Sequence, residues 1–101
     1  MSEKNFNDPP WHPIKDAVDL KHLGKLGEEC AELSRIICRI IIQGIDGIDP
    51  STGEVNRDNL EKEIADVYAN ILLVETRFSL NIDEERIKKK VALQREWHKD
   101  A

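Results

Sequence analysis

Five acidic residues fall into two short groups whose types and spacing suit a metal site. The first group lies in EECAE, residues 28–32, and the second lies in EIAD, residues 63–66. Carboxylates three or four positions apart share one face of an α-helix. Without histidine or cysteine beside them, their oxygens favour hard cations, Mg²⁺ or its substitute Mn²⁺. The chemistry they suggest is that of a bound metal ion, and the candidate residues are Glu28, Glu29, Glu32, Glu63 and Asp66.

The helical phase sets these carboxylates against apolar side chains. At about 100° per residue from Glu28, the apolar face of the first group spans roughly 80° to 180°. On the same wheel Glu29 falls near 100°, inside that face, and Glu32 near 40°, at its edge. The apolar residues are Leu26, Leu33, Ile36, Ile37 and Ile40. In the second group, Glu63, Asp66 and Asn70 flank the apolar stripe of Leu60, Val67, Ile71, Val74 and Phe78.

Carboxylates gathered between two packed helices need a counter-charge. Each ionised group loses several kcal/mol of solvation in a low-dielectric site, and neighbouring carboxylates repel one another. They must be protonated, paired with cations or bound to metal. We expect a metal. The alternative is that Glu29 and Glu32 are rim residues, paired with Lys25, Arg35 or a later helix.

The elements that must position these residues are helical. A short helical segment, residues 16–23, is weakened by Gly24 and Gly27, and the long helices are expected over 25–42 and 57–80. The second has Asp58 or Asn59 as its cap, and Asp83 caps a third helix that reaches about residue 99. Residues 43–56 form the loop between the two metal-binding helices, and residues 1–13 form an irregular, proline-rich arm. The sequence therefore predicts a single all-α domain over residues 1–101.

Composition excludes several classes of protein. A net charge of −5 disfavours nucleic acid as a partner, because nucleic-acid binders present a basic face. No apolar run reaches the roughly 18 residues that would span a membrane, so we expect no membrane partner. Cys30 and Cys38 lack metal-ligand spacing and read as free thiols, which predicts a reducing, cytoplasmic location.

The two acidic groups together carry a family resemblance. EECAE followed by EIAD resembles the signature of the MazG-like, all-α nucleoside triphosphate pyrophosphohydrolases, and the similarity spans roughly residues 20–97. It includes NIDEE, residues 81–85, and the basic stretch KKKVALQREW, residues 88–97. The resemblance implies a Mg²⁺-dependent enzyme that hydrolyses a nucleoside triphosphate, of deoxy or non-standard type, to the monophosphate and pyrophosphate.

Roles for individual residues follow from the resemblance. Glu29, Glu32, Glu63 and Asp66 would be the metal ligands. Glu29 is also assigned to catalysis with Glu28, which could instead be a ligand or a solvated side chain. Four further residues are substrate-binding candidates: Asn70 for the base, and Lys25, Lys90 and Arg95 for the phosphates. For Asn70 the alternative is a hydrogen-bonded amide at the helix interface, for Lys25 an ion pair with Glu29, and for Lys90 a solvated face.

The apolar surface predicts an assembly. Ile41 and Ile42 extend the apolar face of the first long helix, and Leu72 and Leu73 extend that of the second. Helices that are apolar on several sides need burial on several sides. We therefore expect a homodimer, or a homotetramer of dimers, in which two helical hairpins form a four-helix bundle across the dimer. The resemblance implies the same arrangement.

Two other functions fit the same residues. One is a non-catalytic helical adaptor or antitoxin-like interaction protein, whose carboxylates are simply surface groups. The other is a degenerate family member that binds a nucleotide without cleaving it, although the complete carboxylate set speaks against that reading.

Overall fold

The computed structural model describes residues 7–99 and is all-helical over that range. It contains α1 (Ala17–Gln43), α2 (Asn56–Arg77) and α3 (Glu84–His98). Within the described residues β structure is limited to one isolated antiparallel bridge, between Ile48 and Val55. The predicted all-α class is confirmed. None of the described helices is long and apolar enough to cross a membrane.

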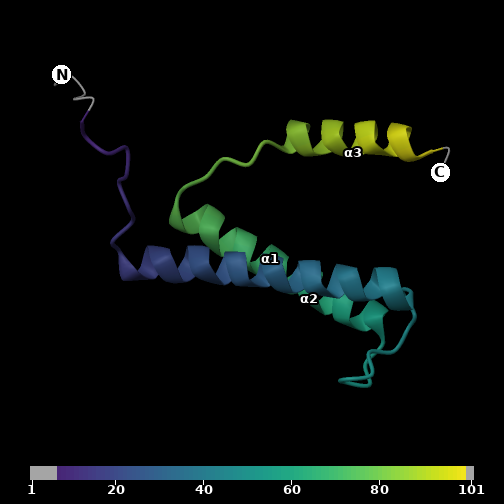
Figure 1. Cartoon of the computed structure of the whole chain (residues 1–101). Helices are drawn as coiled ribbons and strands as arrows, with labels where there is room; N and C mark the ends of the chain where they lie inside the picture. The colour runs from purple at the N-terminus through teal and green to yellow at the C-terminus, as the bar shows by residue number, and fades with distance from the viewer. Residues whose placement is uncertain (1–6, 100–101) are drawn as a thin grey trace.

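α1 and α2 form an antiparallel hairpin (Figure 1). Near its open end, the last residue of α2 is tied to the start of α1. The Arg77 Nε lies 2.6 Å from an Asp19 carboxylate oxygen, and its Nη2 lies 3.1 Å from Asp16. The Asp16 side chain also accepts hydrogen bonds from the amides of Val18 and Asp19, so it caps α1 as well as pairing with Arg77.

The first helix is continuous, and the prediction of a separate short segment over 16–23 was wrong. Gly24 and Gly27 lie inside α1, where each costs about 1 kcal/mol relative to alanine. An added methyl group at either glycine would meet no atom within 4 Å, so no close packing requires them. α1 packs along α2, and tertiary contacts of this kind outweigh the low helix propensity of two glycines.

The loop of residues 44–55 closes the other end of the hairpin. Gly44 has φ +86°, a conformation that favours glycine, and a side chain at Gly47 would collide with the Gln43 carbonyl oxygen. The buried Asp49 accepts hydrogen bonds at Oδ1 from the amide and the hydroxyl of Ser51. The loop is thus held by its own polar groups.

α2 starts earlier than its sequence predicted, and neither Asp58 nor Asn59 caps it. Val55 occupies the cap position without a side-chain hydrogen bond. The side chain of Asn56, which is 2% exposed, instead donates to Gln43 Oε1 at 3.0 Å and to the Gly44 carbonyl at 3.1 Å. A link to the end of α1 therefore fixes this boundary, which local capping rules do not anticipate.

α3 stands apart from the hairpin. Asp83 caps it as predicted, accepting a hydrogen bond from the Arg86 amide, and the helix ends at His98. Within residues 7–99, no Cα of α3 approaches a Cα of α1 or α2 within 8 Å. Figure 1 shows α3 held away from the hairpin by an extended connection. The radius of gyration is 19.1 Å, whereas a compact chain of this length has about 13 Å.

The apolar core of the single chain is small. Among the described residues only Ile36 and Val74 are buried apolar side chains. Ile37, expected on the core face, is half-exposed, and Ile41, Ile42, Leu72 and Leu73 are exposed. The hairpin thus leaves many of its large apolar side chains exposed to water.

Candidate metal centre

Three of the predicted ligands converge where α1 and α2 face each other. Glu29 comes from α1, and Glu63 and Asp66 come from successive turns of one face of α2. One carboxylate oxygen from each of the three lies within 4.8 Å of the other two. The antiparallel hairpin therefore brings together acidic residues that are 34 to 37 positions apart in the chain.

Glu63 is the buried member of this cluster. The residue is 6% exposed, and its Oε1 is buried without a hydrogen-bond partner. Burial, followed by a hydrogen bond with Glu29 and the charges of Glu29, Asp66 and Glu32, raises the pKa of Glu63 to about 7. Glu63 therefore holds a proton to a higher pH than an exposed glutamate does.

Glu29 is the ionised partner of Glu63. Its side chain is 12% exposed, and one carboxylate oxygen lies 3.0 Å from the Lys25 Nζ. The hydrogen bond with Glu63 and then the one with Lys25 lower the pKa of Glu29. Of the two groups, Glu29 therefore carries the negative charge more readily and Glu63 the proton.

Glu32 lies beside the cluster but is not brought into it. The Arg35 guanidinium holds its carboxylate: Nη2 lies 2.6 Å from Oε1, and Nε lies 3.2 Å from each oxygen. The hydrogen bond with Arg35 lowers the pKa of Glu32. The Glu32 side chain is 43% exposed, so water also reaches it.

The donor set fits a hard divalent cation. All three clustered groups offer oxygen, from two helices, and the donor that is most buried has an oxygen with no other partner. A buried polar atom without a partner is costly, and a cation would satisfy it. Cation binding would also offset the repulsion that raises the pKa of Glu63. These residues therefore suit Mg²⁺ or Mn²⁺.

Three of the other predicted residues share one hollow beside the cluster. Lys25, Glu28 and Asn70 line an open depression of about 510 Å³, together with Leu20, Lys21, His22, Gly24 and Leu73. The Asn70 Nδ2 donates to the Asp66 carbonyl at 2.8 Å, which uses one of its two donors. The Lys25 Nζ lies 3.6 Å from a Glu28 carboxylate oxygen. Lys25 and Asn70 are thus each in contact with one of the predicted acidic residues.

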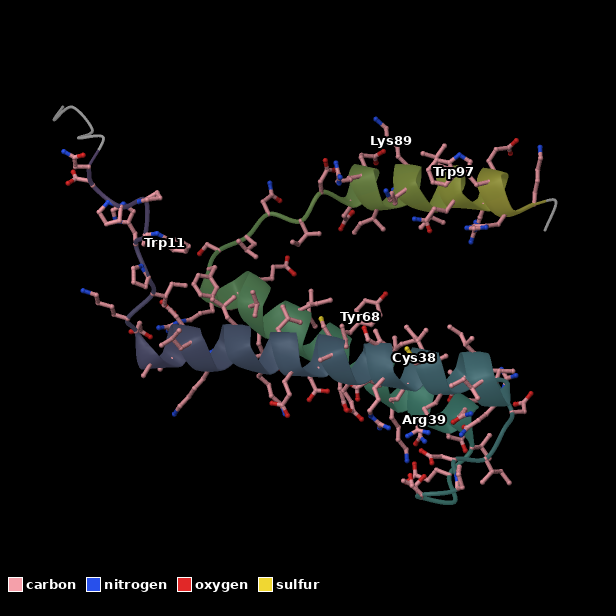
Figure 2. The ribbon with its side chains drawn as sticks, viewed as in Figure 1. Trp11, Cys38, Arg39, Tyr68, Lys89 and Trp97 are labelled. Atoms are coloured by element: carbon pink, nitrogen blue, oxygen red, sulfur yellow. The ribbon has the colours of Figure 1, made fainter. Side chains whose placement is uncertain are left out.

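Lys90 and Arg95 do not reach this site in the single chain, because both belong to α3. Lys90 lines separate depressions on α3 with Arg86. Figure 2 shows Lys89 and Trp97 on the same detached helix. Any contact of α3 with the cluster would have to come from another copy of the chain or from a rearrangement.

Sequence reasoning did not identify Lys21 and His22 as residues of the hollow. Neither belongs to a recognisable motif. Their helical phase was the available signal, since Lys21 lies one turn before Lys25 and two turns before Glu28 on one side of α1. The His22 Nδ1 lies 2.8 Å from the Val18 carbonyl oxygen, which leaves Nε2 for another partner.

Comparison of the chain with protein-family models, with curated proteins and with solved structures gives no match. The likeness to the MazG-like enzymes rests on the sequence motifs alone.

Proposed function

We propose that this protein is a Mg²⁺-dependent nucleoside triphosphate pyrophosphohydrolase, which releases a monophosphate and pyrophosphate. One observation carries the proposal: the buried Glu63 oxygen without a partner points to a cation among three carboxylates on two helices. The spacing that resembles the MazG-like signature coincides with those same residues. Exposed Cys30 and Cys38 suit the reducing cytoplasm in which such an enzyme would work.

Glu29, Glu63 and Asp66 would hold the metal, and Glu32 would join them when it leaves Arg35. Bound Mg²⁺ would supply neutralisation of the triphosphate charge and activation of water. Glu28, on the wall of the hollow, is the candidate to accept a proton from that water, a role it would share with Glu29. Lys25 would pass from Glu29 to a phosphate, and the free donor of Asn70 would face the base.

The proposed active form is a homodimer, or a homotetramer built from dimers, with a four-helix bundle made from two hairpins. The small core and the exposed faces of α1 and α2 support it. The isolated position of α3 supports it too, since a 15-residue helix without tertiary contacts is only marginally stable in water. The third helix of a neighbour would then bring Lys90 and Arg95 to the phosphates.

The decisive experiment assays a panel of nucleoside triphosphates with Mg²⁺ and separates the products. We expect monophosphate and pyrophosphate, with turnover reduced at least 100-fold in Asp66→Asn. Asp58→Asn is the matched control, because it removes an exposed carboxylate from the same helix outside the cluster. Diphosphate and orthophosphate as products, or near-normal turnover in Asp66→Asn, would contradict the proposal.

A non-catalytic adaptor is the second candidate, and a specific observation favours it. Glu29 and Glu32 already have cationic partners in Lys25 and Arg35, as surface carboxylates on helices often do. An adaptor would have the same melting temperature with and without Mg²⁺. A Mg²⁺ concentration on the order of 5 mM is suitable, because it would occupy even a weak site. A nucleotide-binding but inactive protein would instead gain stability from Mg²⁺ with a triphosphate and release no product.

A further inference from the structure

The Arg35 guanidinium and a metal ion would compete for the same carboxylate. Arg35 binds Glu32 through both Nε and Nη2, in the two-pronged geometry that makes arginine–carboxylate pairs specific. Glu32 lies one turn from Glu29 on α1 and within electrostatic reach of Glu63. Glu32 therefore lies next to the three-carboxylate cluster, but its oxygens are bound by the Arg35 guanidinium.

We propose that Arg35 is a positioning residue that holds Glu32 away from the metal centre, so that full coordination requires displacement of its guanidinium. The inference rests on the proposed metal-dependent function. A divalent ion would first meet Glu29, Glu63 and Asp66, the groups already gathered. Glu32 would become the fourth ligand only by giving up its hydrogen bonds to Arg35.

Displacement is feasible because the pair is exposed. The side chains of Arg35 and Glu32 are 51% and 43% exposed, and ion pairs in such surroundings are weak. A divalent cation carries twice the charge of the guanidinium, and direct coordination to it would compensate Glu32 for the lost ion pair.

The released Arg35 would remain near negative charge. The carboxylate of Asp49, buried in the 44–55 loop, interacts electrostatically with both Arg35 and Arg39. Figure 2 shows Arg39 on the side of α1 toward this loop. Exchange of partners by Arg35, from Glu32 toward Asp49, would link occupancy of the metal centre to the loop that joins its two helices.

Mn²⁺ binding, followed by electron paramagnetic resonance of the free ion, tests the inference without measuring activity. Arg35→Gln should bind Mn²⁺ about two- to five-fold more tightly than the unchanged protein, as expected for loss of a weak competing ion pair. Arg35→Lys, which keeps the charge but loses the two-pronged geometry, should also bind more tightly. Arg39→Gln is the matched control for charge, because it removes one arginine a turn further along α1.

A double-variant comparison isolates the route through Glu32. In the Glu32→Gln background, Arg35→Gln should no longer tighten binding, since the carboxylate it releases is gone. Equal tightening in Arg35→Gln and Arg39→Gln, or tightening that persists without Glu32, would show a general charge effect and overturn the inference while leaving the metal centre intact. Absence of Mn²⁺ binding in every variant would overturn the metal centre itself, and this inference with it.

Discussion

An ionised Glu63 destabilises the hairpin unless a cation accompanies it, because the side chain is buried and one oxygen lacks a partner. The pKa of Glu63 is raised to about 7 from 4.5, first by burial and then by the neighbouring carboxylates. The folded protein therefore binds more protons than the unfolded chain between these two values. The stabilising contribution of protonated Glu63 is complete below about pH 4.5 and is lost as the pH rises through about 7.

A pH series without divalent ions tests this assignment. The melting temperature should fall from pH 5 to pH 8, and Glu63→Gln should remove most of that fall. At pH 8 the variant should melt roughly 5 °C higher or more, since 1 kcal/mol shifts the melting temperature of such a domain by about 4–8 °C. The lowered pKa of Glu29 acts in the opposite sense and below pH 4.5, outside this window. Glu61→Gln, at an exposed position of α2, should keep the slope; a flat profile in the unchanged protein would contradict the assignment.

Metal binding should release the proton that Glu63 holds. Mg²⁺ needs the ionised form, so its affinity should rise between pH 6 and pH 8. Calorimetry in two buffers with different ionisation enthalpies measures the released protons directly. We expect up to about one proton per ion near pH 6 and almost none at pH 8, from the pKa of about 7. Proton release that does not change with pH would mean that Glu63 is not a ligand.

Phase on a helical wheel was sufficient to predict the positions of Glu29 and Glu63. Glu29 was placed inside the apolar face of its helix and Glu63 beside the apolar stripe of the next, and both are at least partly buried between α1 and α2. Phase could not decide the partner of Glu32, because a side chain at the edge of the stripe reaches either the cluster or Arg35 by a change of rotamer. The pairing of Lys25 with Glu29 was foreseen as an alternative, since residues four apart on a helix are neighbours.

At the scale of the elements, polar links rather than propensity fix the helix boundaries. The sequence predicted a break near Gly24, but α1 is continuous there. It predicted a cap at Asp58 or Asn59, but α2 begins at Asn56, whose side chain donates a hydrogen bond to the end of α1. Such links join residues 12 or 13 positions apart, which rules on local sequence do not consider. Asp83 was predicted correctly because its capping bond is local, to Arg86 three residues on.

The link through Asn56 can be tested by removing it. Asn56→Ala should lower the free energy of unfolding by about 1–3 kcal/mol, because the two hydrogen bonds that the Asn56 side chain donates to the end of α1 are lost. Asp46→Asn is the matched control in the same loop, where an exposed pair with Arg57 is broken, and it should leave stability almost unchanged. Urea titration measures both. Equal effects of the two substitutions would show that the buried link is not special.

At the scale of the whole molecule, the single chain lacks sufficient burial. Its extents are 58 × 36 × 28 Å, and among residues 7–99 α3 is linked to the hairpin only through the connecting chain. A stable domain of this length normally buries well over half of the surface of its unfolded chain. The exposed apolar positions lie on all three helices, so a second copy offers burial to each of them. Sequence pattern indicated this excess of apolar surface, but a pattern in one chain does not specify which faces meet.

The final prediction concerns assembly. Leu72 is 61% exposed on α2, and a charge there would have to be buried in the proposed four-helix bundle. Sedimentation at micromolar concentration should show the unchanged protein at twice the 11.6 kDa chain mass or more, and Leu72→Asp as a smaller, less stable species without activity. Ile48→Asp is the control, because Ile48 is an equally exposed apolar residue in the 44–55 loop, outside the helical faces. It should assemble and turn over normally. A fully active monomer, or loss of assembly in both variants alike, would refute a dimer built on the face of α2. The contacts that stabilise α3 would then have to come from another surface.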